Sequence, residues 1–152
     1  MTEFETLGVG NWMIRVPKDW VVSDESTAGV LHVESGNGAK ALSVSSWNLG
    51  DGVTRSGAEI AASFKQAELK SLGEMAGYTW RLMAEESLQA GDTSIFFTDN
   101  WDAANGYRIA GIVMARPPLV VRATFHDYAC TDYAASARYF APIIDSLELR
   151  AA

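Results

Sequence analysis

Apolar and polar residues alternate along most of this chain, a pattern typical of strands that bury one face. In the first third, the alternation predicts strands over residues 12–16, 20–23, 29–34 and 41–47. In the second half, it predicts strands over residues 80–89, 94–101, 107–115 and 119–125. Short turns rich in Pro, Gly, Asn and Asp separate these runs, so consecutive strands are expected to be antiparallel neighbours. The pattern therefore predicts a large antiparallel sheet that begins with a meander of short strands.

The periodicity becomes helical at two places. Ser56 and Glu59 fit the Ser-x-x-Glu capping box, and the apolar stripe behind them predicts a helix at about residues 57–73. Asp132 is a suitable N-cap for a second helix at about residues 132–146, which carries its own apolar stripe. Pro142 lies inside that stripe, and because proline removes a backbone donor, we expect a kink or a late restart of the helix there.

The element order predicts the fold class. Strands, one helix, four strands and one helix indicate an α+β fold, in which a twisted antiparallel sheet of about 6–8 strands is packed by two helices. The chain has 152 residues, of which 48% are hydrophobic. This is enough for one core, and no repeat or linker marks a boundary, so a single domain over residues 1–152 is expected.

Charge and cysteine content narrow the classes of partner and compartment. The formal net charge is −7, and the basic residues are scattered, which argues against nucleic acid and anionic membranes as partners. No apolar run approaches the ~20 residues that span a bilayer, so membrane insertion is not expected. Cys130 is the only cysteine and no secretory leader is evident, which favours a cytoplasmic location, or a periplasmic one if a leader has been removed.

Two segments carry a family resemblance. Ile14-Arg-Val-Pro17-Lys-Asp-Trp20 and Phe140-Ala-Pro-Ile-Ile-Asp-Ser146-Leu-Glu-Leu149 resemble the two ends of PsbP/DcrB-like domains. That superfamily includes the photosystem PsbP subunit, a small Ran-binding nuclear import factor, bacterial lipoproteins, and adaptor chaperones of type VI secretion effectors. The resemblance implies this α+β fold and a binding or assembly role. It supplies no catalytic residues and no cofactor.

Candidate chemical motifs give little support for catalysis. His126, Asp127 and Cys130 lie close together in sequence, but hydrolytic Cys/His partners usually come from distant segments, so a structural interpretation is favoured. With two histidines and one cysteine, a structural zinc site is almost excluded. The sequence therefore predicts no enzyme, no metal site and no cofactor.

The large aromatic residues give the candidate binding site. Five Trp and several Phe and Tyr are many for this length, and a filled core accounts for only part of them. Strand parity places Phe97, Asp99 and Trp101 on one face if Phe96 faces the helices. Exposed aromatic and Arg side chains are typical of protein-binding hot spots. The predicted partner-binding residues, on an open sheet face, are Trp47, Phe97, Trp101, Tyr107 and Arg122.

These residues favour a non-enzymatic protein-binding module, such as an adaptor or chaperone for a secreted effector, whose partner presents an apolar helix or a basic surface. A second hypothesis is an immunity protein that neutralises a toxin, because an acidic surface complements a basic active site. A third is a carrier or hydrolase for a small apolar ligand, with a pocket between sheet and helices. Exposed strand edges also leave a homodimer open.

Overall fold

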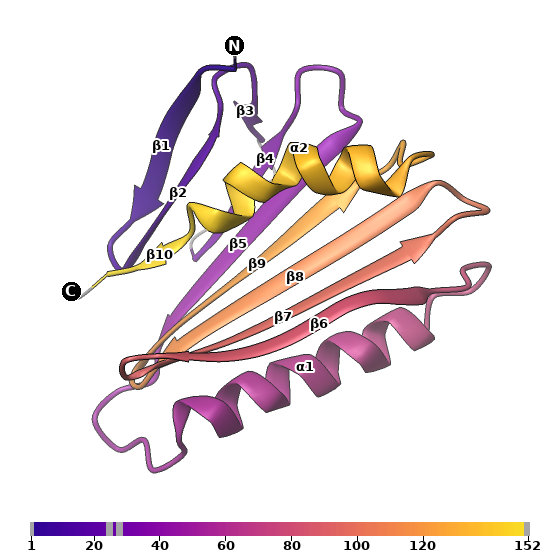
Figure 1. Cartoon of the computed structure of the whole chain (residues 1–152). Helices are drawn as coiled ribbons and strands as arrows, with labels where there is room; N and C mark the ends of the chain where they lie inside the picture. Colours follow the sequence, from indigo (N-terminus) through magenta and orange to yellow (C-terminus); the bar gives the residue numbers. More distant parts are fainter. Residues whose placement is uncertain (1, 24–25, 27–28, 151–152) are drawn as a thin grey trace.

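The computed structural model describes residues 2–23, 26 and 29–150. The predicted domain, residues 1–152, also spans the positions outside these ranges, so that part of the prediction lies outside the described residues. Figure 1 shows a central sheet, one helix on each of its faces, and a small sheet beside the second helix. The predicted α+β class, with a large antiparallel sheet and two helices, is confirmed.

The elements follow the predicted order with two additions. The strands are β1 Phe4–Val9, β2 Trp12–Pro17, β3 Val21–Val22, β4 Val30–Glu34, β5 Lys40–Asn48, β6 Arg81–Ala90, β7 Thr93–Asp102, β8 Tyr107–Arg116, β9 Leu119–Asp127 and β10 Glu148–Leu149. The helices are α1 Gly57–Gly73 and α2 Tyr133–Asp145. β1 and β10 were not predicted, and together with β2 they form a sheet of their own in the order β1-β2-β10.

The large sheet has seven strands in the order β3-β4-β5-β9-β8-β7-β6, all antiparallel. The turn after Pro17 does break the chain as predicted, but the strands on its two sides belong to different sheets. The expected meander from residue 12 is therefore wrong at its start: β2 pairs with β1 and β10, and the large sheet begins only at β3.

One core lies between the large sheet and the layer formed by α2 and the small sheet. Ile14 and Val16 of β2 pack with Leu42 and Phe125 of the large sheet, and Phe140 of α2 joins the same cluster. All five side chains are buried. At roughly 1.5–3 kcal/mol for each fully buried large apolar side chain, this layer contributes most of the hydrophobic stabilisation.

The second core lies on the opposite face, beneath α1. Ile60 and Ala61 of the helix pack against Phe96 and Val113 of the sheet. The predicted capping box is present: the Ser56 side chain accepts a hydrogen bond from the Glu59 backbone N–H, and the Glu59 carboxylate accepts one from the Ser56 backbone N–H. The two helices thus cover opposite faces, which is the feature that determines where the candidate site residues point.

The second helix runs without interruption through Pro142. Its N-cap is Asp132, as predicted, and the Asp132 carboxylate accepts a hydrogen bond from the Ala135 backbone N–H. The expected restart near Pro142 is wrong. The docking of Phe140 and Ile143 in the core holds the helix on both sides of the proline, which offsets the loss of one backbone donor.

Candidate functional site

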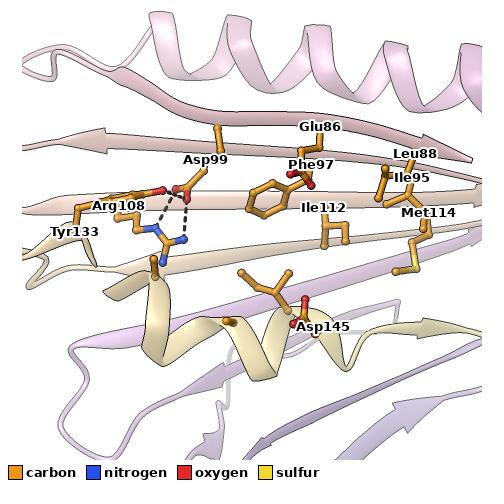
Figure 2. A pocket seen from close by; sticks show the side chains of 14 residues that line it. Glu86, Leu88, Ile95, Phe97, Asp99, Arg108, Ile112, Met114, Tyr133 and Asp145 are labelled. Atoms are coloured by element: carbon orange, nitrogen blue, oxygen red, sulfur yellow. Dashed lines mark hydrogen bonds and ion pairs between the residues drawn. The ribbon is translucent and has the colours of Figure 1, made fainter. Parts of the chain in front are cut away.

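A largely apolar groove of about 430 Å³ lies between α2 and the β6–β8 half of the large sheet. In Figure 2 the side chains that line it form a row along β6, β7 and β8, with α2 as the facing wall. Its lining is Ala84, Glu86, Leu88, Ile95, Phe97, Asp99, Arg108, Ile112, Met114, Tyr133, Ala137, Ala141, Ile144 and Asp145.

Strand parity and two small helical residues produce this groove. Ile95, Phe97 and Asp99 alternate along β7 and share the face that carries α2, as parity predicts. Ala137 and Ala141 lie one helical turn apart on α2 and present only methyl groups to the sheet. Because these side chains are short, the floor beneath them stays partly uncovered. Leu88 of β6 is 57% exposed beside it.

A buried polar network closes one end of the groove. The Arg108 guanidinium donates from Nε to Asp99 Oδ1 at 2.9 Å and from Nη2 to Asp99 Oδ2 at 2.8 Å. Arg108 Nη1 also donates to Ser136 Oγ at 3.1 Å, and the Tyr133 hydroxyl donates to Asp99. Burial, together with the hydrogen bond to Asp99, raises the pKa of Tyr133 to about 12. Tyr133 therefore stays a donor near neutral pH, and the network fixes the N-terminal turn of α2 to the sheet.

Two carboxylates stand beside the apolar part of the groove. Glu86 comes from β6 and Asp145 from the last turn of α2 (Figure 2). Neither takes part in the ion pairs found within residues 2–23, 26 and 29–150. The groove therefore combines an apolar floor with two carboxylates that form no ion pair within the described part of the chain.

The five predicted binding residues do not share one face. Phe97 lines the groove, and Trp101 lies on the same face, where its Nε1 donates to the Cys130 carbonyl at 3.0 Å. Trp47, Tyr107 and Arg122 lie on the face that carries α1. Trp47 packs on Phe64 of α1, and Tyr107 and Arg122 border a separate hollow. The expectation of one open face holding all five is wrong, because helices cover both faces.

Arg108 lies on the groove face, whereas Arg122 does not. Arg108 is 3% exposed and is bonded to Asp99. The register between β7 and β8 places Arg108 opposite Trp101, on the groove face, whereas the register between β8 and β9 places Arg122 opposite Val113, on the other face. Asp145 and Tyr133 were not singled out from the sequence. Their signal is weak: an i, i+4, i+8 row of Tyr133, Ala137 and Ala141 on one helix face.

The hollow on the α1 face holds a tyrosine and a histidine that are hydrogen-bonded to each other. The Tyr107 hydroxyl and His126 Nδ1 are 2.7 Å apart, and burial lowers the pKa of His126 to about 4. His126 is thus neutral at neutral pH. Cys130 is buried elsewhere, and burial raises the pKa of its thiol, which disfavours a thiolate nucleophile. Within the described ranges, no cluster of three His, Cys, Asp or Glu residues is placed to hold a metal ion.

Glu68 of α1 is a titratable group whose carboxylate points toward the sheet. It accepts a hydrogen bond from the Thr98 hydroxyl at 3.0 Å, while its Oε1 is buried without a hydrogen-bond partner, close to Gly111. Burial raises the pKa of Glu68 above its ordinary value, although Thr98 and Arg122 act in the opposite direction.

We expect this buried acid to make stability depend on pH. Because the pKa is higher in the folded than in the unfolded chain, the free energy of unfolding should fall as pH rises above 4.5, until the folded-state pKa is passed. Glu68→Gln cannot ionise, so it should reduce that fall by on the order of 1 kcal/mol, a typical cost for a buried unpaired polar group. Urea denaturation across this pH range measures it. The exposed Glu74→Gln is the control, and an equal slope in Glu68→Gln and wild type would contradict the assignment.

Comparisons with known proteins identify the fold. No known family model matches the chain, and no curated protein matches it in sequence. The structure of cyanobacterial PsbP (CyanoP) from Synechocystis sp. PCC 6803 is similar with a TM-score of 0.67 at 11% identity, over 98% of this chain and 94% of that one. A Pseudomonas aeruginosa protein of unknown function, PA94, has a TM-score of 0.51 at 11% identity, over 98% and 99%.

A third similar structure is a Bacteroides thetaiotaomicron VPI-5482 protein, with a TM-score of 0.51 at 15% identity. This chain is covered over 92% of its length and spans 45% of that protein. Together these structures show a PsbP-like α+β fold, as the two end segments of the sequence predicted. Among the described helices, neither is long and apolar enough to cross a bilayer.

Proposed function

We propose that this chain is a protein-binding module, without catalytic activity, whose site is the groove between α2 and the β6–β8 half of the sheet. The observation that carries the proposal is the combination of an apolar floor, formed by Phe97, Ile112 and Met114, with Glu86 and Asp145, two carboxylates that take part in no ion pair of the described residues. Apolar contact area gives affinity, and opposite charge steers association and selects partners. The partner is therefore an apolar segment that carries Lys or Arg.

The adaptor role for a secreted effector is the specific form of this proposal. An adaptor must shield an apolar segment of its client from water, and a groove of this composition does so. A toxin-neutralising role uses the same negative charge, because a basic active site is complementary to it. The two roles differ in whether apolar contact or charge holds the partner. An adaptor, which binds through its apolar floor, should still bind a client segment whose basic residues have been removed. A toxin held mainly by charge should be released when the salt concentration is raised.

Peptide selection tests the groove assignment. Short random peptides displayed on phage are selected on the wild-type protein, resynthesised, and titrated against Phe97→Thr by fluorescence anisotropy. Phe97 lies on the groove floor, so we expect its truncation to weaken binding at least about tenfold, or ~1.4 kcal/mol. The selected sequences should combine apolar residues with Lys or Arg.

The matched control is Trp47→Thr, which truncates an aromatic side chain on the opposite face that is 38% exposed. It should bind as wild type does. Loss of binding in Trp47→Thr with none in Phe97→Thr would move the site to the α1 face. If no peptide is selected but a fluorescent fatty acid binds in a Phe97-dependent manner, the groove holds a small apolar ligand and the protein-binding proposal is wrong.

A further inference from the structure

The longest open edge of the large sheet belongs to a strand of the groove itself. β6 ends the seven-stranded sheet on one side, and the opposite edge strand, β3, has only two residues. From Ala84 to Ala90, β6 pairs with β7 in unbroken register, after one register shift between Leu82 and Ala84. Natural sheets usually shorten, interrupt or cover such an edge, because it offers unpaired N–H and C=O groups to another chain.

The hairpin that follows β6 determines which backbone groups face outward. Gly91 and Asp92 form a two-residue loop between the paired residues Ala90 and Thr93, and Gly91 has a φ of 61°. The pair beside such a loop exchanges both of its hydrogen bonds, and the pattern alternates from there. Glu85, Ser87 and Gln89 thus direct their backbone N–H and C=O away from β7. Among the described residues, none of the turn, loop or cap backbone hydrogen bonds uses these groups.

Space for side chains lies on both sides of this edge. Ala84, Glu86 and Leu88 face the groove. Ser87 and Gln89 border a smaller hollow of about 360 Å³ beside α1. α1 packs on β7 and β8, and its Lys65 reaches β6 through the ion pair with Glu85. The alternate side chains of an added strand would extend the groove on one face and would lie on the α1 side of the sheet on the other.

Charge decides which kind of chain fits. Glu85 is paired with Lys65 of α1, while Glu86 has no ion pair within the described part of the chain. Antiparallel pairing of two copies centred on β6 would bring Glu85 and Glu86 against the same residues of the second copy, and like charges opposite one another are destabilising. The net charge of −7 adds to that repulsion. A second copy is thus disfavoured, and a basic partner is favoured.

We infer that β6 accepts an extended segment of another protein as an additional antiparallel strand, with Lys or Arg opposite Glu86 and apolar residues opposite Ala84 and Leu88. This inference rests on the proposed function, because it specifies how the partner of the same groove is held. Main-chain hydrogen bonds to Glu85, Ser87 and Gln89 supply affinity, and the groove face supplies the choice of side chains.

The test uses a synthetic peptide with Val, Lys and Val at alternate positions, Thr between them, and blocked ends. Its titration compares Ser87→Pro with Ser87→Val. Proline removes the outward N–H and is tolerated on an edge strand, whereas valine keeps the donor and favours a strand. We expect wild type and Ser87→Val to bind alike, and Ser87→Pro to bind at least about tenfold more weakly. Circular dichroism confirms that both variants fold.

Two altered peptides complete the test. Glu in place of Lys, or N-methylation of alternate amides, should each weaken binding to wild type. If Ser87→Pro does not fold, the N-methylated peptide carries the test of main-chain pairing. Equal binding by Ser87→Pro and Ser87→Val, or by the N-methylated peptide, overturns the inference. If the same samples still lose binding on Phe97→Thr, the groove proposal stands and only the strand mode is wrong. If Phe97→Thr binds fully as well, both fail.

Discussion

Replacing Arg108 by Met should lower the free energy of unfolding by about 3–5 kcal/mol, because it leaves the Asp99 carboxylate buried without its charge partner. Asp99 is 2% exposed and Arg108 3%, and the guanidinium makes two hydrogen bonds to the carboxylate. Tyr133 retains its hydrogen bond to Asp99, but a neutral donor does not replace a full positive charge. Urea denaturation at neutral pH measures the loss.

The double variant Arg108→Met with Asp99→Asn should recover part of that stability, since it removes the buried charge as well as its partner. The matched surface control is Lys18→Met. Lys18 pairs with Glu3 at 3.4 Å, but both side chains are more than half exposed, so the change should cost no more than about 1 kcal/mol. If Arg108→Met lowers the free energy of unfolding by less than about 1 kcal/mol, solvent must reach Asp99. The polar network would then not close this end of the groove.

Replacing Phe140 by Ala should cost about 3–5 kcal/mol, the usual range for a fully buried aromatic ring. Phe140 is 1% exposed and contacts Trp20 and Phe125 edge to face, with ring centroids 6.2 and 6.1 Å away. These contacts join α2, the turn after β2 and the centre of the large sheet. Thermal unfolding followed by circular dichroism would show the loss as a lowered midpoint.

The same variant should also weaken peptide binding at the groove, because α2 is one of its walls. The control is Leu69→Ala on α1, where a side chain that is 42% exposed is truncated on the other face. It should change stability by less than about 1 kcal/mol and leave binding unaltered. A Phe140→Ala variant with unchanged stability would contradict the packing of α2 described above.

The sequence predicted most elements within one or two residues, because each depends on local chemistry. The capping box at Ser56 and the parity of β7 both hold. β1 was not recognised because Phe4-Glu-Thr-Leu-Gly-Val9 contains no sustained alternation, and β10 because a two-residue strand carries no period. Pro17 was recognised as a break, but no local pattern specifies that the chain changes sheets there.

The candidate site was predicted less well, for a different reason. Parity relates residues within one strand, but a common face across strands also requires the register. The pairing of Trp101 with Arg108 places Arg108 on the groove face, and the pairing of Val113 with Arg122 places Arg122 on the other. A capping signal likewise predicts that a helix exists, not which face it covers. Phe97 was predicted correctly as a groove residue because its face follows from its position next to Phe96 on the same strand. That inference does not depend on the register between strands.

The pairing of β10 with β2 brings Leu149 opposite Trp12, and β5 pairs with β9 across all the elements between them. These pairings require segments that are far apart in sequence to meet. Closing such long loops costs conformational entropy, and this cost comes before the contacts that compensate for it have formed. The β6–β9 hairpins need no such search. During synthesis these hairpins are complete before β10 has been made and can pair with Trp12 and Met13, which leaves an apolar surface in contact with water and other chains in the interval.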